Sequence, residues 1–165
     1  MTRLLSSAFA CLVLTLQLTF AQAAAAEEPA KPAPTQEELE KKFAETMSGA
    51  TLVGRFTTRE MGVDKPLAED RYTLGKVHKL KNGLWSFETR IQYGERDVTL
   101  PLALEVKWAG DTPVITLDNV LVPGLGTFNS RVLVHDDEYA GTWSGGNHGG
   151  QLFGRITRAA DSETK

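Results

Sequence analysis

The sequence predicts an all-β protein, an eight-stranded antiparallel up-and-down barrel with a short N-terminal helix. Two observations predict this fold. From Ala50 onward apolar residues recur at every second position, the period of a strand with one buried face. Eight such segments follow one another with mostly short connections, and a long meander tends to close because closure removes exposed strand edges. A two-sheet β-sandwich is the alternative.

Length and composition fit one globular domain. The chain has 165 residues, of which 41% are hydrophobic and 24% charged. The net charge is −3 without a long block of either sign, which argues against a nucleic-acid binder. The single cysteine, Cys11, lies in a segment expected to be removed. The mature chain would then hold no disulfide, zinc–cysteine cluster or cysteine nucleophile.

Residues 1–23 resemble a signal peptide in composition. Arg3 gives the positive start, Ala8 to Phe20 are largely apolar, and Ala21-Gln22-Ala23 is a small-x-small cleavage site. This apolar stretch of about 13 residues is too short to span a bilayer, which takes about 20. We therefore expect an exported protein, periplasmic or extracellular, with no membrane span in its mature form.

A linker and a helix follow. Residues 24–34 are rich in Ala, Pro and Glu, as in an extended linker. A helix is predicted over 35–48, because Thr35 and Glu38 have the spacing of a capping box. One narrow apolar stripe, expected to cover part of the β domain, contains Leu39, Phe43 and Met47.

The β domain is predicted over 50–158, with a polar tail at 159–165. The expected strands lie at about 51–58, 70–80, 85–93, 97–108, 113–122, 127–135, 138–144 and 151–158. Pro101 falls within a strand and predicts an edge or a bulge there. The long connection Arg59–Glu69 is expected to lie across one mouth of the barrel.

Two resemblances follow from these segments. The short helix, the opening Leu52-Val53-Gly54-Arg55-Phe56, the long first loop and the meander are similar to the calycin group, which includes lipocalins, avidins and fatty-acid-binding proteins. Lipocalins usually have Gly-x-Trp where this chain has Gly54-x-Phe56, and the cysteine pair and C-terminal helix are missing. The ending from Tyr139 to Ile156 resembles an uncharacterised exported family of planctomycete-type bacteria, which implies no activity.

Aromatic residues are the main candidates for a binding site. An eight-stranded barrel is either filled by side chains or holds one small ligand. The residues expected to face inward and line such a pocket are Trp85, Phe87, Tyr93, Trp108 and Trp143. The loop Gly145–Gly150, with Asn147 and His148, is a second candidate, although a hairpin tip also explains its glycines.

No catalytic residues, metal site or cofactor are predicted. The three histidines, at positions 78, 135 and 148, fall on different elements without ligand spacing. The expected function is a non-catalytic binding domain, holding a small apolar or amphipathic ligand. The alternative is a solid β domain that acts as an envelope-associated interaction or structural module. An interior of roughly 300 Å³ or more would favour the pocket.

Overall fold

The structure, a computed structural model, describes residues 32–158. The predicted signal peptide (1–23), most of the predicted linker (24–34) and the predicted tail (159–165) lie outside the described residues. The elements are α1 (Gln36–Met47), β1 (Thr51–Phe56), β2 (Arg59–Glu60), β3 (Val63–Asp64), β4 (Ala68–Lys79), β5 (Trp85–Tyr93), β6 (Arg96–Ala109), β7 (Thr112–Val122), β8 (Gly126–His135), β9 (Glu138–Gly145) and β10 (His148–Thr157).

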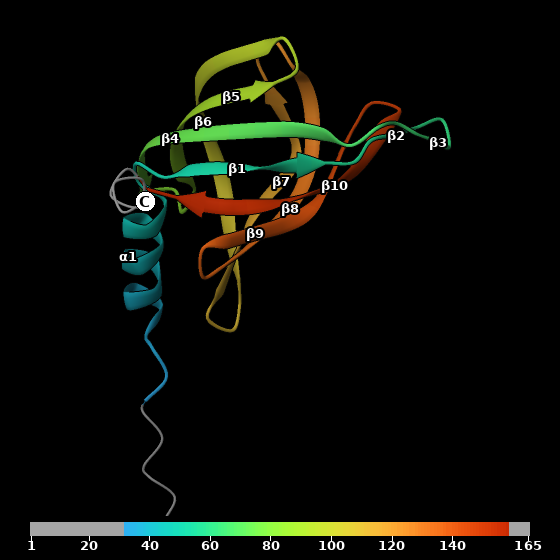
Figure 1. Cartoon of the computed structure of the whole chain (residues 1–165). Coiled ribbons are helices and arrows are strands. Elements are labelled where there is room, and N and C mark those ends of the chain that lie inside the picture. Colours follow the sequence, from blue (N-terminus) through green and yellow to red (C-terminus); the bar gives the residue numbers. More distant parts are fainter. Residues whose placement is uncertain (1–31, 159–165) are drawn as a thin grey trace, which may run out of the picture. The chain divides into compact units, whose positions relative to one another are not determined.

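Eight of these strands form the predicted closed antiparallel barrel (Figure 1). Their order is β1-β4-β5-β6-β7-β8-β9-β10, and β10 pairs back onto β1. This closing pair runs from Thr51 opposite Thr157 to Phe56 opposite Leu152. The alternative of two packed sheets is therefore wrong, since first and last strands share one ladder.

Helix α1 covers one end of the barrel. Its capping box is formed as predicted, with Thr35 and Glu38 bonding to each other's backbone and side chain. Phe43 and Met47 of the apolar stripe are buried in the main core, whereas Leu39 is half-exposed. The Ser48 hydroxyl at the end of the helix bonds to the backbone of Val77 on β4. We call the opposite end, where β1 ends and β10 begins, the mouth.

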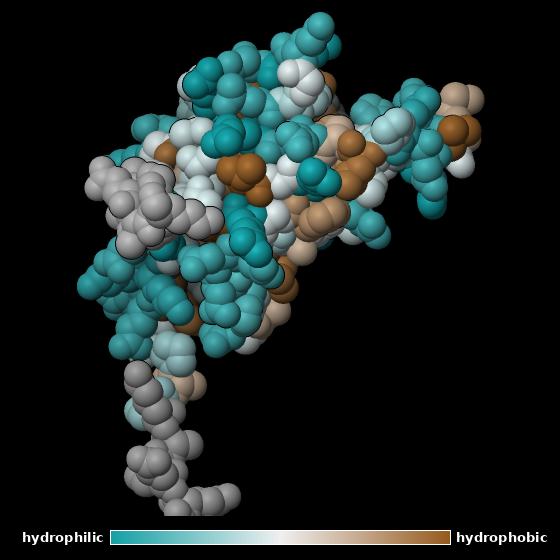
Figure 2. Space-filling view, viewed as in Figure 1, coloured by the Kyte–Doolittle hydropathy of each residue, from teal (hydrophilic) through white to brown (hydrophobic). Residues whose placement is uncertain are grey.

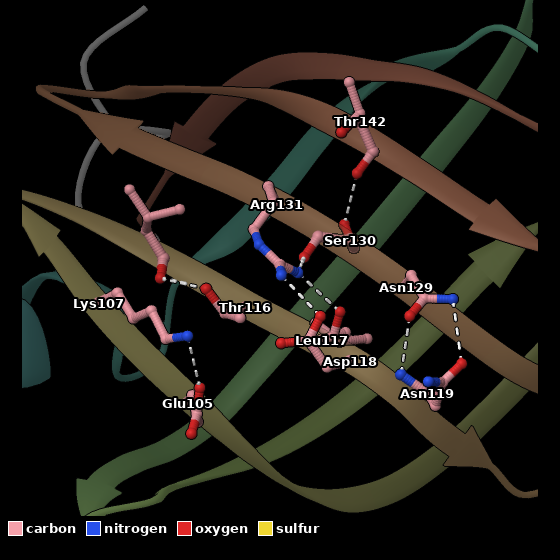
Figure 3. Close-up of polar contacts among 11 residues, drawn as sticks. Glu105, Lys107, Thr116, Leu117, Asp118, Asn119, Asn129, Ser130, Arg131 and Thr142 are labelled. Atoms are coloured by element: carbon pink, nitrogen blue, oxygen red, sulfur yellow. Dashed lines mark hydrogen bonds and ion pairs between the residues drawn. The ribbon is translucent and has the colours of Figure 1, made fainter.

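Two bulges curve the barrel wall. The β4–β5 register shifts between Leu74 and Val77, and the β7–β8 register shifts between Leu117 and Val120. Each extra residue lets two apolar side chains three positions apart face inward, and bulges increase strand bending. In β7 the bulge residues make side-chain hydrogen bonds with β8, as Figure 3 shows. Arg131 bonds to Asp118 at 2.6 Å, and the backbone N–H of Asn119 donates to the Asn129 side chain at 2.9 Å.

The barrel wall is split between β6 and β7 near the mouth. β6 pairs with β5 over residues 96–104, but with β7 only over 105–109. Pro101 falls in the stretch with no partner on the β7 side, so the predicted local edge is confirmed. This gap in the hydrogen-bonded ladder is closed by side chains, because Leu100 of β6 and Val122 of β7 pack in one buried cluster there.

The connection between β1 and β4 contains a small hairpin, β2–β3. β2 pairs with His148 and Gly149 at the start of β10, so the hairpin extends the β9–β10 arm. Figure 1 shows it projecting away from the barrel. The prediction that this segment lies across a mouth is wrong, because pairing with β10 carries it outward. Figure 2 shows hydrophobic atoms at its outer tip, where Met61 and Val63 lie.

Candidate functional site

A cavity occupies the barrel between α1 and the mouth. Its volume is about 280 Å³. Apolar side chains form most of its wall, and Met47 of α1 lies at its closed end. The lining residues are Met47, Leu52, Phe56, Tyr72, Leu74, Phe87, Thr89, Ile91, Tyr93, Leu102, Leu104, Ile115, Leu117, Val122, Leu125, Phe128, Ser130, Val132, Tyr139, Trp143, His148 and Leu152. None of them is Lys, Arg, Asp or Glu.

Four aromatic side chains surround the mouth end of the cavity, and we call them the aromatic rim: Phe56, Tyr93, Phe128 and Trp143. Their ring centroids form a chain, with Phe56 at 6.0 Å from Tyr93 and 5.9 Å from Trp143, and Phe128 at 6.4 Å from Trp143. His148 continues it at 5.3 Å from Trp143. All five residues are half-exposed, so the cavity meets solvent here.

The Trp143 indole is held in place by the backbone. Its Nε1–H donates to the carbonyl oxygen of Thr57 at 3.2 Å. Thr57 follows β1 directly, and its hydroxyl accepts from the backbone N–H of Gln151 on β10. Trp143 therefore presents a fixed ring to the cavity, and only its apolar surface is offered to an occupant.

The five predicted aromatic residues do not all lie together. Phe87, Tyr93 and Trp143 line the cavity. Trp85 and Trp108 face inward as expected, but they lie at the α1 end and pack on Phe43, with centroid distances of 5.0 and 6.1 Å. These two indoles thus belong to the packed core beneath α1 and not to the cavity wall.

One part of the Gly145–Gly150 loop forms the hairpin tip, and another part lines the cavity. The tip itself is the connection from Gly145 to His148, with Gly146 at φ +58°. His148 lines the cavity, whereas Asn147 does not and lies 3.4 Å from the His148 ring nitrogen Nδ1. Both residues also border an open hollow between this tip and the β2–β3 hairpin.

A buried carboxylate behind the cavity wall was not predicted. Asp70 on β4 is only 3% exposed, and its two oxygens accept hydrogen bonds from different tyrosines. Tyr139 donates to Oδ1 at 3.0 Å and Tyr72 donates to Oδ2 at 3.1 Å. Both tyrosines line the cavity. In the described part of the chain, Asp70 has no Lys, Arg or His within ion-pair distance.

Burial governs the protonation of this cluster. Desolvation raises the pKa of Asp70 above its ordinary value, and the two hydroxyl bonds oppose that rise. Burial, together with the nearby Asp70 charge, also raises the pKa values of Tyr72 and Tyr139. Both tyrosines therefore stay neutral hydrogen-bond donors at physiological pH.

Two glycines let the cluster form. Tyr139 on β9 is the register partner of Gly154 on β10. Gly154 in turn pairs with Gly54 on β1, and Gly54 pairs with Asp70 on β4. A Cβ at Gly54 would overlap the Tyr139 hydroxyl, and a Cβ at Gly154 would approach the Tyr139 ring to 2.8 Å. The ring therefore lies over both glycines. Glycines inside strands were the available signal, since they mark a close approach of another group.

No three His, Cys, Asp or Glu side chains come together as metal ligands between residues 32 and 158. Over the same range, no helix combines the length and apolar character needed to cross a bilayer.

Comparison of the chain with protein-family models, curated proteins and solved structures gave no match in any of the three. The resemblances to calycins and to an exported planctomycete-type family stay predictions.

Proposed function

We propose that the protein is an exported, non-catalytic binding protein that holds one small apolar or amphipathic molecule inside its barrel. The observation that carries this proposal is the cavity of about 280 Å³ with its largely apolar wall. Protein interiors are normally close-packed, and an unfilled apolar space forfeits dispersion contacts. A bound molecule would restore those contacts.

The size of the cavity supports a small occupant. Its volume is just below the roughly 300 Å³ at which small-molecule sites begin. It is well above the ~150 Å³ of an engineered apolar cavity that binds benzene. At the packing density of protein interiors, about 0.74, the space holds roughly a dozen carbon-sized groups.

Tryptophan fluorescence tests this proposal, because only one of the three indoles lines the cavity. A hydrophobic dye or a medium-chain alcohol should bind at one saturable site and change the emission. The Trp143→Phe variant should lose most of that change, whereas the control Trp108→Phe should keep it, since Trp108 packs on Phe43. Calorimetry should give a negative heat-capacity change from apolar burial.

Absence of saturable binding across several apolar ligand classes would contradict the pocket. So would an emission change that persists in Trp143→Phe and disappears in Trp108→Phe, because that result would put the ligand outside the cavity.

Export has a separate test. Because Ala21-Gln22-Ala23 precedes an acidic, proline-containing stretch, the exported chain should begin between Ala24 and Glu27. Intact-mass analysis of protein from the medium and the periplasm measures this start directly. A major species that retains Cys11 would contradict the proposal.

A second candidate is an interaction module that acts through the β2–β3 hairpin. It is favoured by two exposed apolar side chains at the hairpin tip, Met61 at 84% and Val63 at 59%. Replacing both with Ser should then reduce association with isolated cell envelopes and leave dye binding unchanged. Unchanged envelope association would argue against this candidate.

A further inference from the structure

We infer that the cavity takes an apolar molecule with a positively charged ammonium head and discriminates against carboxylates. This inference rests on the proposed function, because it specifies the ligand of the same cavity. Three features carry it: the charge of the wall, the position of Asp70 and the aromatic rim.

The cavity wall holds no Lys or Arg that could pair with an anion. Its polar groups are hydroxyls of Thr, Ser and Tyr together with His148. Moving a carboxylate out of water is costly unless it gains a positive partner or several hydrogen bonds. Tyr72 and Tyr139 cannot supply these bonds, since their hydroxyls already donate to Asp70. This leaves Tyr93 and His148, both at the mouth, as donors. A fatty-acid head group is therefore disfavoured inside.

Asp70 supplies the opposite charge. Both of its oxygens accept hydroxyl hydrogens, which is the bonding pattern of an ionised carboxylate. It lacks a cationic partner among the described residues, so its negative potential reaches into the low-dielectric cavity. A ligand cation would be the missing counter-charge.

The aromatic rim lies next to this charge. Asp70 is the register partner of Tyr93, and the neighbouring inward pair along β1 and β4 is Phe56 with Ala68. Aromatic faces attract ammonium groups placed within about 6 Å of the ring centroid. Phe56, Tyr93 and Trp143 bring three rings to the same end of the cavity as the carboxylate. An ammonium head at the mouth would meet these faces while its apolar chain fills the interior.

Three probes with the same alkyl chain separate charge from apolar burial. Octyltrimethylammonium, octanol and nonanoate all carry an eight-carbon alkyl chain and differ only in their heads, and each is small enough for the cavity. Titration of the full mature chain below micellar concentrations should give the tightest binding for octyltrimethylammonium. Octanol should be intermediate, and nonanoate at least ten-fold weaker than the ammonium.

Variants locate the source of the discrimination. Asp70→Asn should lower the affinity for octyltrimethylammonium to that for octanol and leave octanol binding unchanged. The control Asp97→Asn removes an exposed carboxylate paired with Arg90 and should change neither affinity. If Asp70→Asn does not fold, Trp143→Leu serves instead, and it should weaken ammonium binding more than octanol binding.

Each outcome decides between the two proposals. Nonanoate binding as tightly as the ammonium, or the ammonium binding no better than octanol, overturns this inference and leaves the apolar pocket standing. An unchanged ammonium preference in folded Asp70→Asn also overturns it. If none of the three probes binds, the proposed function itself fails.

Discussion

The hydroxyl of Tyr139 on β9 donates a 3.0 Å hydrogen bond to Asp70 on β4, across the two intervening strands β10 and β1. The bond therefore spans the seam where the last strand of the barrel meets the first. It joins residues 69 positions apart in the chain and is buried. The seam is held by this side-chain contact as well as by its backbone ladder.

Removing this hydroxyl should destabilise the protein. Tyr139→Phe leaves one oxygen of a buried carboxylate without its donor, which typically costs about 1–3 kcal/mol. The matched control is Tyr93→Phe, whose hydroxyl makes no hydrogen bond within residues 32–158, and it should be close to neutral. Urea unfolding measures both. Equal midpoints for the two variants would contradict the structural role of the bond.

The contribution of Asp70 to stability should fall as pH rises through the pKa of this residue. Burial raises that pKa above the ordinary value of 3.8, so the native state binds this proton more tightly than the unfolded state. The favourable contribution is complete below about pH 3.8 and is lost as the folded group ionises. Asp70→Asn cannot ionise, so it should gain stability relative to the wild type as pH rises from about 4 upward.

Asp97→Asn provides a control of opposite sign. The hydrogen bond from Arg90 lowers the pKa of Asp97, so its contribution is present at neutral pH and is lost as pH falls. Urea unfolding of the three proteins across pH 3–8 should therefore give opposite trends for the two variants relative to the wild type. Parallel trends would contradict the assignment for Asp70.

Gly154→Ala should be strongly destabilising although the residue lies in a regular strand. The added methyl group would overlap the Val53 carbonyl oxygen and approach the Tyr139 ring to 2.8 Å. Overpacking of this kind costs about 1–3 kcal/mol. Thermal unfolding measures it, with Gln151→Ala, an exposed position on the same strand, as the control. A near-neutral Gly154→Ala would mean that the Tyr139 ring does not lie over the glycines.

Most of the fold could be predicted because alternation of apolar residues reports directly on strands. The connections between the eight strands show as clear breaks. The β2–β3 hairpin and its pairing with β10 could not be predicted, since two-residue strands show no period, and neither could the bulges in β4 and β7. The same alternation gives the face of a side chain but not its depth along the barrel axis. This is why Trp85 and Trp108 were expected beside Trp143 but lie under Phe43.

The polar part of the site could not be predicted. Asp70 stands near the start of a strand, where an aspartate is usually solvated. Its burial depends on Tyr139, and nothing local in the sequence links the two residues. Glycines at positions 54 and 154 were visible, but a glycine in a strand does not indicate which side chain will cover it.

Truncating Phe43 should show how much of the barrel depends on its helix. Its ring is 3% exposed and meets Trp85, Phe87 and Trp108 at centroid distances of 5.0–6.2 Å. Phe43→Ala should cost about 3–5 kcal/mol because it leaves a cavity among these rings. Urea unfolding measures the loss, and Lys42→Ala on the exposed face is the control. An unchanged midpoint would mean that the helix is not docked.

The ladder between β1 and β10 has a consequence for the order of folding. Thr51 and Thr157 are register partners 106 positions apart, so the barrel can close only when its last strand is available. Loop closure over such a separation carries a large entropic cost and slows folding. A chain emerging from a ribosome would hold an open sheet with two free edges until β10 is available. Closure is therefore the last step in forming the sheet, and folding should be slow for a domain of this size.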